Sequence, residues 1–166
     1  ELTGRPFTLD GDLTKVSYDG WRKKYEITDE DIEAMRQVSF DYNPKFSIVI
    51  PLYDTKISFL RELLDSFENQ IYKNWELCLA DGTGEGSPLE TIVREYMDKD
   101  NRIKYEILAD NKGISENTNA AIRMATGDFI VLADHDDVVS VHALFECAKA
   151  LNKDKSIDVI YSDEDK

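Results

Sequence analysis

The chain has 166 residues, of which 42% are hydrophobic and 10% aromatic, so it is long enough for one domain with a buried core. Its 34 acidic and 20 basic residues give a net charge of −14. Such a surface repels nucleic acid and anionic membranes, and we expect no nucleic-acid partner. No apolar run approaches the length of a membrane span.

The two cysteines, Cys78 and Cys147, lie in apolar stretches and form no CxxC motif. This pattern predicts two buried, reduced thiols, which suits the cytoplasm. We expect a cytoplasmic protein whose inner-membrane association, where there is one, is made through other parts of a longer parent chain.

Residues 1–43 are polar and aromatic and lack a strand pattern. The stretch "YDGWRKKYEITDEDIEAMRQV" favours helical pieces, with Thr28 as an N-cap and Asp31 three residues later, close to a capping box. Asn43 stands before Pro44, which disfavours the helical conformation. We therefore predict a helical leader over residues 1–43 and a separate unit over residues 44–166.

From Phe46 onward, apolar runs alternate with stretches of helical spacing. Continuous apolar runs are typical of strands buried on both faces, and alternating strands and helices predict parallel crossovers. The fold class is therefore α/β, a Rossmann-like, mostly parallel sheet with flanking helices. The expected strands are 46–51, 75–80, 102–108, 128–133 and 157–162, and the expected helices are 56–70, 88–99, 114–126 and 141–153.

Helix ends are marked by particular residues. Pro88 is expected at the start of the helix over 88–99, and Gly127 at the C′ position of the helix over 114–126. Ser115 and Ser140 are candidate N-caps, and Thr83 or Ser87 is a candidate cap for the helix over 88–99.

Ligands of such sheets bind beyond the carboxyl ends of the strands. The segments at those ends are "PLYDT", "DGTGEGS" and "DHDD". If "DHDD" stays extended, Asp134 and Asp136 point to one side with Cα atoms roughly 7 Å apart. Paired carboxylates suit Mg²⁺ or Mn²⁺, whereas the alternative is a solvated acidic turn capped by Ser140.

The other segments favour a nucleotide. The carboxylate of Asp81 is placed to accept an N–H from a base, although a flexible glycine turn is the alternative, and neither GxGxxG nor GxxxxGK[ST] is present. Tyr53 is placed to stack on a base or is simply an exposed aromatic. Asn111 and Gly113 begin a helix whose free amides favour anions, while capping by Ser115 is the structural alternative.

Taken in order, "FSIVIPLYDT", "WELCLADGTGE", "DNKGISENTNAAIRMATGDFIVLADHDD" and "IDVIYSDEDK" resemble the family 2 glycosyltransferases of GT-A fold over residues 46–166. The leader is similar to that of bacterial members that build surface polysaccharides, including rhamnosyltransferase-like proteins. The resemblance identifies residues 44–166 as the N-terminal, nucleotide-sugar-binding part of such a domain, cut before its acceptor half.

The resemblance implies an inverting transfer of a sugar from a UDP- or dTDP-type donor to a glycan acceptor in bacterial polysaccharide biosynthesis. Pro51, Tyr53 and Asp54 would line the nucleotide pocket, and Asp81 would bind the base. Asp134 and Asp136 would be the DxD pair that holds Mn²⁺ or Mg²⁺, with Asp134 also near the ribose and sugar and Asp137 as a neighbour.

The resemblance also places the catalytic base beyond Lys166, so the chain alone is expected to have little or no activity. The family often has Asn at the position of Asp54, Asp at Gly82, Ser at Gly84 and Arg at Thr118. Two alternatives stay open at this point. The first is Mg²⁺-dependent phosphoryl transfer or a receiver-like acidic pocket, for which Asp54 is the candidate nucleophile. The second is a non-catalytic scaffold.

Overall fold

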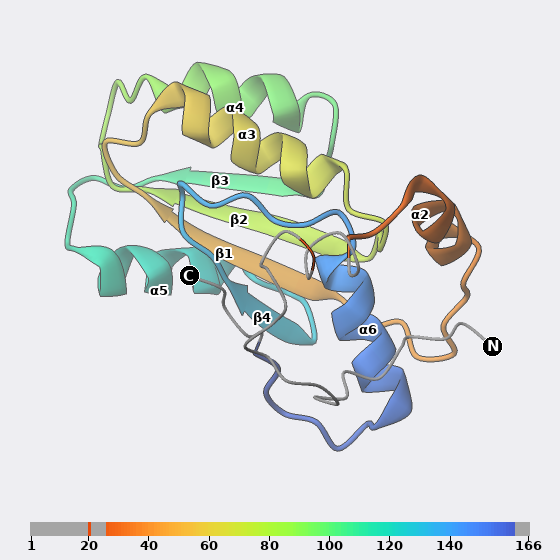
Figure 1. The fold of residues 1–166 in the computed structure, drawn as a ribbon. Helices are drawn as coiled ribbons and strands as arrows, with labels where there is room; N and C mark the ends of the chain where they lie inside the picture. Colours follow the sequence, from red (N-terminus) through yellow and green to blue (C-terminus); the bar gives the residue numbers. More distant parts are fainter. Residues whose placement is uncertain (1–19, 21–25, 162–166) are drawn as a thin grey trace.

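The computed structural model describes residue 20 and residues 26–161. A sheet with helices on both faces makes up this part of the chain (Figure 1), which confirms the predicted α/β fold class. The strands are β1 (Phe46–Leu52), β2 (Trp75–Asp81), β3 (Ile103–Ile107) and β4 (Phe129–Leu132), and the helices are α2 (Asp29–Arg36), α3 (Ile57–Glu68), α4 (Leu89–Met97), α5 (Ile114–Met124) and α6 (Ala143–Lys153).

The four strands lie in the order β3-β2-β1-β4 and all run parallel. Every residue of β1 and β2 is buried because these strands are central and covered on both faces. The carboxyl ends of the strands therefore meet at one edge of the molecule, and their amino ends meet at the opposite edge (Figure 1). This arrangement brings the loops predicted to bind ligand into one region.

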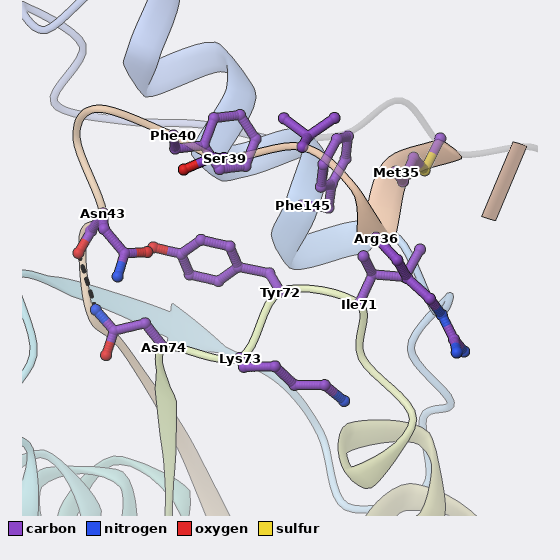
Figure 2. A pocket seen from close by; sticks show the side chains of 11 residues that line it. Met35, Arg36, Ser39, Phe40, Asn43, Ile71, Tyr72, Lys73, Asn74 and Phe145 are labelled. Carbon is purple, nitrogen blue, oxygen red and sulfur yellow. Dashed lines mark hydrogen bonds between the residues drawn. The ribbon is translucent and has the colours of Figure 1, made fainter. Parts of the chain in front are cut away.

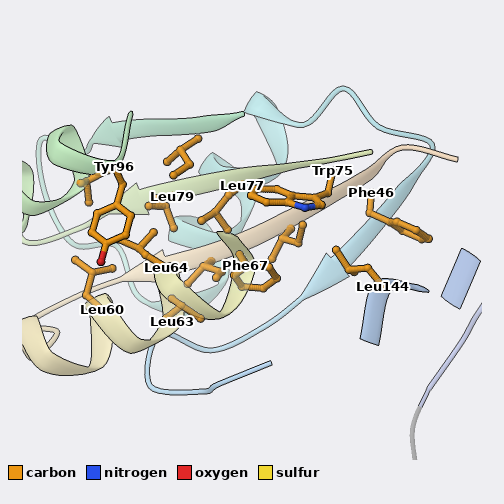
Figure 3. Close-up of a cluster of buried hydrophobic side chains, with 14 of the residues drawn as sticks. Phe46, Leu60, Leu63, Leu64, Phe67, Trp75, Leu77, Leu79, Tyr96 and Leu144 are labelled. Atoms are coloured by element: carbon orange, nitrogen blue, oxygen red, sulfur yellow. The ribbon is translucent and has the colours of Figure 1, made fainter. Parts of the chain in front are cut away.

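The larger core fills the face of the sheet that α3, α4 and α6 cover (Figure 3). Phe46, Leu64, Phe67 and Trp75 are at most 2% exposed there. Complete burial of a side chain such as Leu64 contributes about 1.5–3 kcal/mol relative to leaving it in water. On the other face, α5 packs small residues against β1 and β2. The close approach of α5 to the sheet follows from those small residues.

The α2 helix confirms the predicted capping box. Thr28 Oγ1 accepts a hydrogen bond from Asp31 N at 3.2 Å, and the Asp31 carboxylate accepts one from Thr28 N at 3.0 Å. The remainder of the predicted leader helix, residues 1–19 and 21–25, lies outside the described residues. Within the described part of the chain, no helix combines the length and hydropathy needed to cross a bilayer.

The prediction of a fifth strand over residues 157–162 is wrong for residues 157–161, and residue 162 is outside the described part. Ile157 packs against the core, but Val159 is 79% exposed and Tyr161 is 86% exposed. An apolar run becomes a strand only when a neighbouring strand satisfies its backbone groups. Within residues 26–161, β4 pairs only with β1, so this segment does not add to the sheet.

Gly127 does not close α5 as predicted. The helix ends at Met124, and Ala125 is already extended. A Cβ at Gly127 would lie 2.5 Å from the carbonyl oxygen of Lys45 and 2.7 Å from Ser47 Oγ. Glycine is needed at this position because two segments of backbone approach each other here.

The amino end of the sheet holds a buried ion cluster around Glu76. Its carboxylate is paired with Lys45 and, at 3.0 Å, with Lys104, and it accepts hydrogen bonds from Ser47 Oγ at 2.8 Å and from Thr126. Burial alone would raise the pKa of Glu76, but the hydrogen bonds from Lys45, Thr126, Lys104 and Ser47 lower it far below its usual range. The cluster ties β1, β2 and β3 to the turn before β4.

Burial also raises the pKa of Cys78 to about 11, in line with the predicted buried thiol. The prediction of a buried thiol is wrong for Cys147, which packs against the larger core but is only partly buried. Both cysteines are free, as predicted.

Candidate functional site

The loop after β1 is fixed by the loop after β2. Asp54 has a positive φ of 48°, a conformation that Asp and Asn adopt more readily than most residues. Its backbone N–H donates to Thr83 Oγ1 at 3.3 Å. Tyr53 beside it is 53% exposed, so its ring is free to receive a planar ligand. The strained backbone at Asp54 lies at the predicted ligand-binding edge, where such conformations gather.

Asp81 organises the loop that follows β2. This carboxylate is fully buried and accepts hydrogen bonds from Thr83 N at 2.8 Å, Ser87 Oγ at 2.5 Å and Tyr105 Oη at 2.6 Å. Burial and the bond to Asp81 raise the pKa of Tyr105 well above its usual range, so the phenol stays protonated and continues to donate. Ser87 Oγ also accepts from Leu89 N at 3.3 Å, but the N-cap of α4 is Pro88, so neither Thr83 nor Ser87 caps this helix as predicted.

Tyr105 and Asn117 were not singled out from the sequence. Tyr105 stands between the charged residues Lys104 and Glu106 on β3, and nothing in its own segment points to Asp81 on another strand. Asn117 stands three and four residues before Ala120 and Ala121, which face the sheet. That helical spacing is the signal from which a buried polar side chain in α5 could have been inferred.

The start of α5 packs directly against Gly82. Asn117 is 2% exposed, and its Nδ2 donates to Asn111 Oδ1 at 2.9 Å. A Cβ at Gly82 would lie 2.4 Å from that same nitrogen. A side chain at residue 82 would therefore overlap the Asn117 amide.

Gly113 is the N-cap of α5, with a φ of 90° that favours glycine. Asn111 Oδ1 accepts from its backbone N–H at 2.9 Å. Ser115 lies within the first turn and makes no capping bond, so the predicted capping by Ser115 is wrong. The backbone N–H groups of Ile114 and Ser115 remain available to a ligand at the N-terminus of this helix.

The acidic loop after β4 is a turn. Asp137 N donates to the carbonyl oxygen of Asp134 at 3.3 Å, so residues 134–137 fold back and are not extended as the predicted Asp134–Asp136 geometry assumes. His135 Nδ1 is buried without a partner among the described residues. The predicted cap of α6 is also wrong, since Ser140 offers its carbonyl oxygen and the helix starts at Ala143.

A cavity of about 280 Å³ lies between this turn, the end of β1 and the start of α5. Asp134 lies on its wall together with Asp137, while Asp136 is not among the residues that line it. Thr118 also lines the cavity, and its hydroxyl donates to the carbonyl oxygen of Ile114 at 2.8 Å. The lining residues are Val49, Pro51, Ile114, Thr118, Leu132, Ala133, Asp134 and Asp137.

The carboxylates of this cavity are open to a cation. Neither Asp134 nor Asp137 forms an ion pair with a lysine or arginine of residues 26–161. No group of three or more metal-binding side chains gathers in the described part of the chain. The protein thus offers two carboxylates here, which is the number through which Mg²⁺ is usually bound when substrate phosphates complete its shell.

The structure therefore brings the predicted residues together in two adjoining groups. Pro51 and Asp134 share the cavity, while Asp54 and Asp81 are linked through Thr83 and Asn111 lies against Gly82 beside them. Both groups meet at the start of α5. One continuous region at the carboxyl end of the sheet is the candidate site.

Known proteins are similar to this chain over much of its length. The chain is 33% identical over 133 residues to the O-antigen biosynthesis protein RfbC of Myxococcus xanthus, covering 80% of this chain and 10% of that protein. It is 31% identical over 160 residues to the hyaluronan synthase of Pasteurella multocida, covering 96% of this chain and 15% of that protein. The chain thus spans a small part of these relatives.

A solved structure, S. aureus TarS 1–349 in complex with UDP-GlcNAc, matches 66% of this chain and 31% of its own, with a TM-score of 0.60 and 26% identity. This agreement confirms the GT-A type of fold. The family model for glycosyl transferase family 2 matches residues 47–165, which is most of the chain. The chain therefore belongs to the family 2 glycosyl transferases.

Proposed function

We propose that this chain is the donor-binding part of an inverting glycosyltransferase that moves a sugar from a nucleoside diphosphate to a glycan acceptor in bacterial polysaccharide synthesis. The observation that carries the proposal is the cavity lined by Asp134 and Asp137 together with Ile114 and Thr118 of α5. Carboxylates for a cation thus share one cavity with the start of a helix, where free amides favour a phosphate. The family membership favours this reaction over phosphoryl transfer.

The donor is proposed to be a UDP- or dTDP-sugar. TarS, which shares the fold and 26% of its residues, is described in complex with UDP-GlcNAc. In this chain Tyr53 would stack on the base, Asp81 and its loop would form the base edge of the pocket, and Pro51 would lie beneath the ribose. Asn111 and Gly113 would support the phosphates through the first turn of α5.

Asp134 and Asp136 are proposed to hold Mn²⁺ or Mg²⁺. Exposed carboxylates without basic partners are hard oxygen donors that fit such a cation. The cation, when bound, supplies Lewis-acid stabilisation of the diphosphate leaving group. Asp137 is the neighbour that the structure places in the cavity, and its role relative to Asp136 is part of the test. The catalytic base is proposed to lie beyond Lys166.

The test is calorimetric titration of the 166-residue chain with UDP and with dTDP, each with and without Mn²⁺. We expect Mn²⁺-dependent binding that Asp134→Asn weakens by at least about tenfold, a loss typical of disturbed metal sites. Asp136→Asn should do the same, whereas Asp137→Asn should have the smaller effect. A larger effect of Asp137→Asn than of Asp136→Asn would identify Asp137 as the second ligand of the cation.

The matched control is Asp98→Asn, which removes one exposed carboxylate at the end of α4. It should leave binding unchanged. Equal binding by wild type and Asp134→Asn, or no Mn²⁺-dependent binding of either nucleotide, would contradict the proposal and favour a scaffold role.

A further inference from the structure

One buried polar atom in the region of the candidate site has no partner. Asn117 of α5 is 2% exposed, and its Oδ1 accepts no hydrogen bond within the described part of the chain. The start of α5 lies at the edge of the sheet where β1 and β2 end (Figure 1). A buried acceptor without a donor is costly to the fold, so its presence here calls for a reason.

Other asparagines beside the core are better satisfied. The partly buried Asn152 accepts at Oδ1 from Tyr42 N at 3.0 Å, and its Nδ2 donates to the carbonyl oxygens of Tyr42 and Ala148. At the amino end of the sheet, Figure 2 shows the cavity in which Asn74 Nδ2 donates to the carbonyl oxygen of Asn43 at 2.8 Å. Asn152 thus uses both ends of its amide, whereas Asn117 uses only one.

Asp81 has little capacity left to bind a base. One oxygen of this fully buried carboxylate accepts from Thr83 N, and the other accepts from both Ser87 Oγ and Tyr105 Oη. A carboxylate has about four acceptor sites, and most of those on Asp81 are therefore occupied. Asp81 fixes the residues around it and leaves recognition of the base to another group.

The Asn117 amide reaches the place that a side chain at residue 82 would occupy. A Cβ at Gly82 would lie 2.4 Å from Asn117 Nδ2 and 3.3 Å from Asn111 Oδ1. Gly82 N donates to the carbonyl oxygen of Leu52 at 2.8 Å, and Tyr53, which is proposed to stack on the base, follows Leu52. The amide therefore lies against the backbone that connects the ends of β1 and β2.

This amide still has an acceptor and a donor to offer. Nδ2 carries two hydrogens, and it donates to Asn111 Oδ1 at 2.9 Å, while Oδ1 has no described partner. Uracil and thymine both present an N3–H between two carbonyl groups. A side-chain amide matches such an edge, because its oxygen accepts the N–H and its nitrogen donates to a neighbouring carbonyl oxygen.

We propose that Asn117 recognises the base of the nucleotide donor, with Oδ1 accepting the N3–H of uracil or thymine. This inference rests on the proposed function and adds a specificity-determining residue to it. Because Oδ1 is covered in this structure, base binding has to shift the backbone near Gly82. Gly82 is followed by a loop that is exposed at Thr83 and Glu85 and contains two further glycines, which permit such a shift.

The experiment is a chemical double-mutant cycle, measured by calorimetric titration of the 166-residue chain in the presence of Mn²⁺. The ligands are UDP and N3-methyl-UDP, which lacks the N–H. Wild type should bind N3-methyl-UDP about tenfold more weakly than UDP. Asn117→Ala should bind UDP about tenfold more weakly than wild type and should lose little more on methylation, because the acceptor is gone.

The matched control is Asn101→Ala, which removes an exposed asparagine before β3 and should behave as wild type. A residue that only supports the loop would change the affinity for both nucleotides by the same factor. A second measurement needs no variant: in the labelled wild-type chain, the side-chain N–H signals of Asn117 should shift with UDP and much less with N3-methyl-UDP.

The outcomes separate this inference from the proposed function. Equal affinity of wild type for the two nucleotides, or the same affinity ratio in wild type and Asn117→Ala, would overturn the inference alone, since Mn²⁺-dependent UDP binding would remain. Asn117 signals that do not respond to UDP would also overturn it. Wild type that binds no UDP in the presence of Mn²⁺ would overturn both.

Discussion

Carboxylates at the two ends of the sheet differ in whether basic side chains compensate their charge. At the amino end, Glu76 is 2% exposed and paired with two lysines and two hydroxyls. At the carboxyl end, Asp134 and Asp137 are exposed and have no basic partner within the described residues. A carboxylate whose charge is compensated inside the protein stabilises the fold, while one that is not compensated is available to a ligand.

The largest effect is expected from breaking the amino-end cluster. Glu76→Ala leaves Lys45 and Lys104 without their carboxylate and should lower the free energy of unfolding by about 3 kcal/mol. Urea denaturation measures this. Glu95→Ala is the matched control, because it breaks an exposed ion pair with Arg61 and should cost at most about 1 kcal/mol. Similar losses for both variants would mean that burial of Glu76 does not matter.

A smaller effect is expected at the carboxyl end from Gly82→Ala. The added methyl group would overlap the Asn117 amide, which is buried and held by Asn111, so the free energy of unfolding should fall by about 2 kcal/mol. The double variant Gly82→Ala/Asn117→Ala removes the overlap and should recover part of that loss, as urea denaturation of both variants would reveal. Additive losses would show that the two residues do not interfere.

The smallest effect concerns pH. Because the folded-state pKa of Glu76 is lowered, its contribution to stability is present above the ordinary glutamate pKa of about 4.3 and is lost as the pH falls below it. Wild type should therefore lose about 1 kcal/mol more than Glu76→Gln over the first pH unit below that value. Parallel urea titrations at several pH values measure the difference. Identical pH dependence would contradict the assigned role of Glu76.

Much of this architecture could be predicted from local patterns. The apolar runs gave four of the strands, and the helical spacing of residues such as Leu60, Leu63 and Leu64 gave the helices between them. The order of these elements predicted the parallel sheet, and the rule on carboxyl ends then predicted the region where Asp81 and Asp134 lie. These predictions succeeded because burial and periodicity act within one segment.

The failures share another cause. Residues 157–161 are mostly of types that favour strands, but they could form a strand only by pairing with a neighbouring strand. In the described structure they have no such partner. Likewise, the position of Gly127 in the sequence predicts the end of a helix. In the structure, the missing side chain instead leaves room for the carbonyl oxygen of Lys45. The conformation at each of these positions depends on contact with a segment that is far away in the chain.

The amino-acid sequence by itself determined four of the strands and the helices between them, because hydrophobic periodicity is local. Only the tertiary structure decided that Asn117 occupies the space beside Gly82, that the acidic loop turns so that Asp137 joins Asp134, and that Lys45 and Lys104 meet at Glu76. Apart from the turn at Asp134, those contacts join residues distant in sequence, and their energies depend on distances that exist only after the chain has folded.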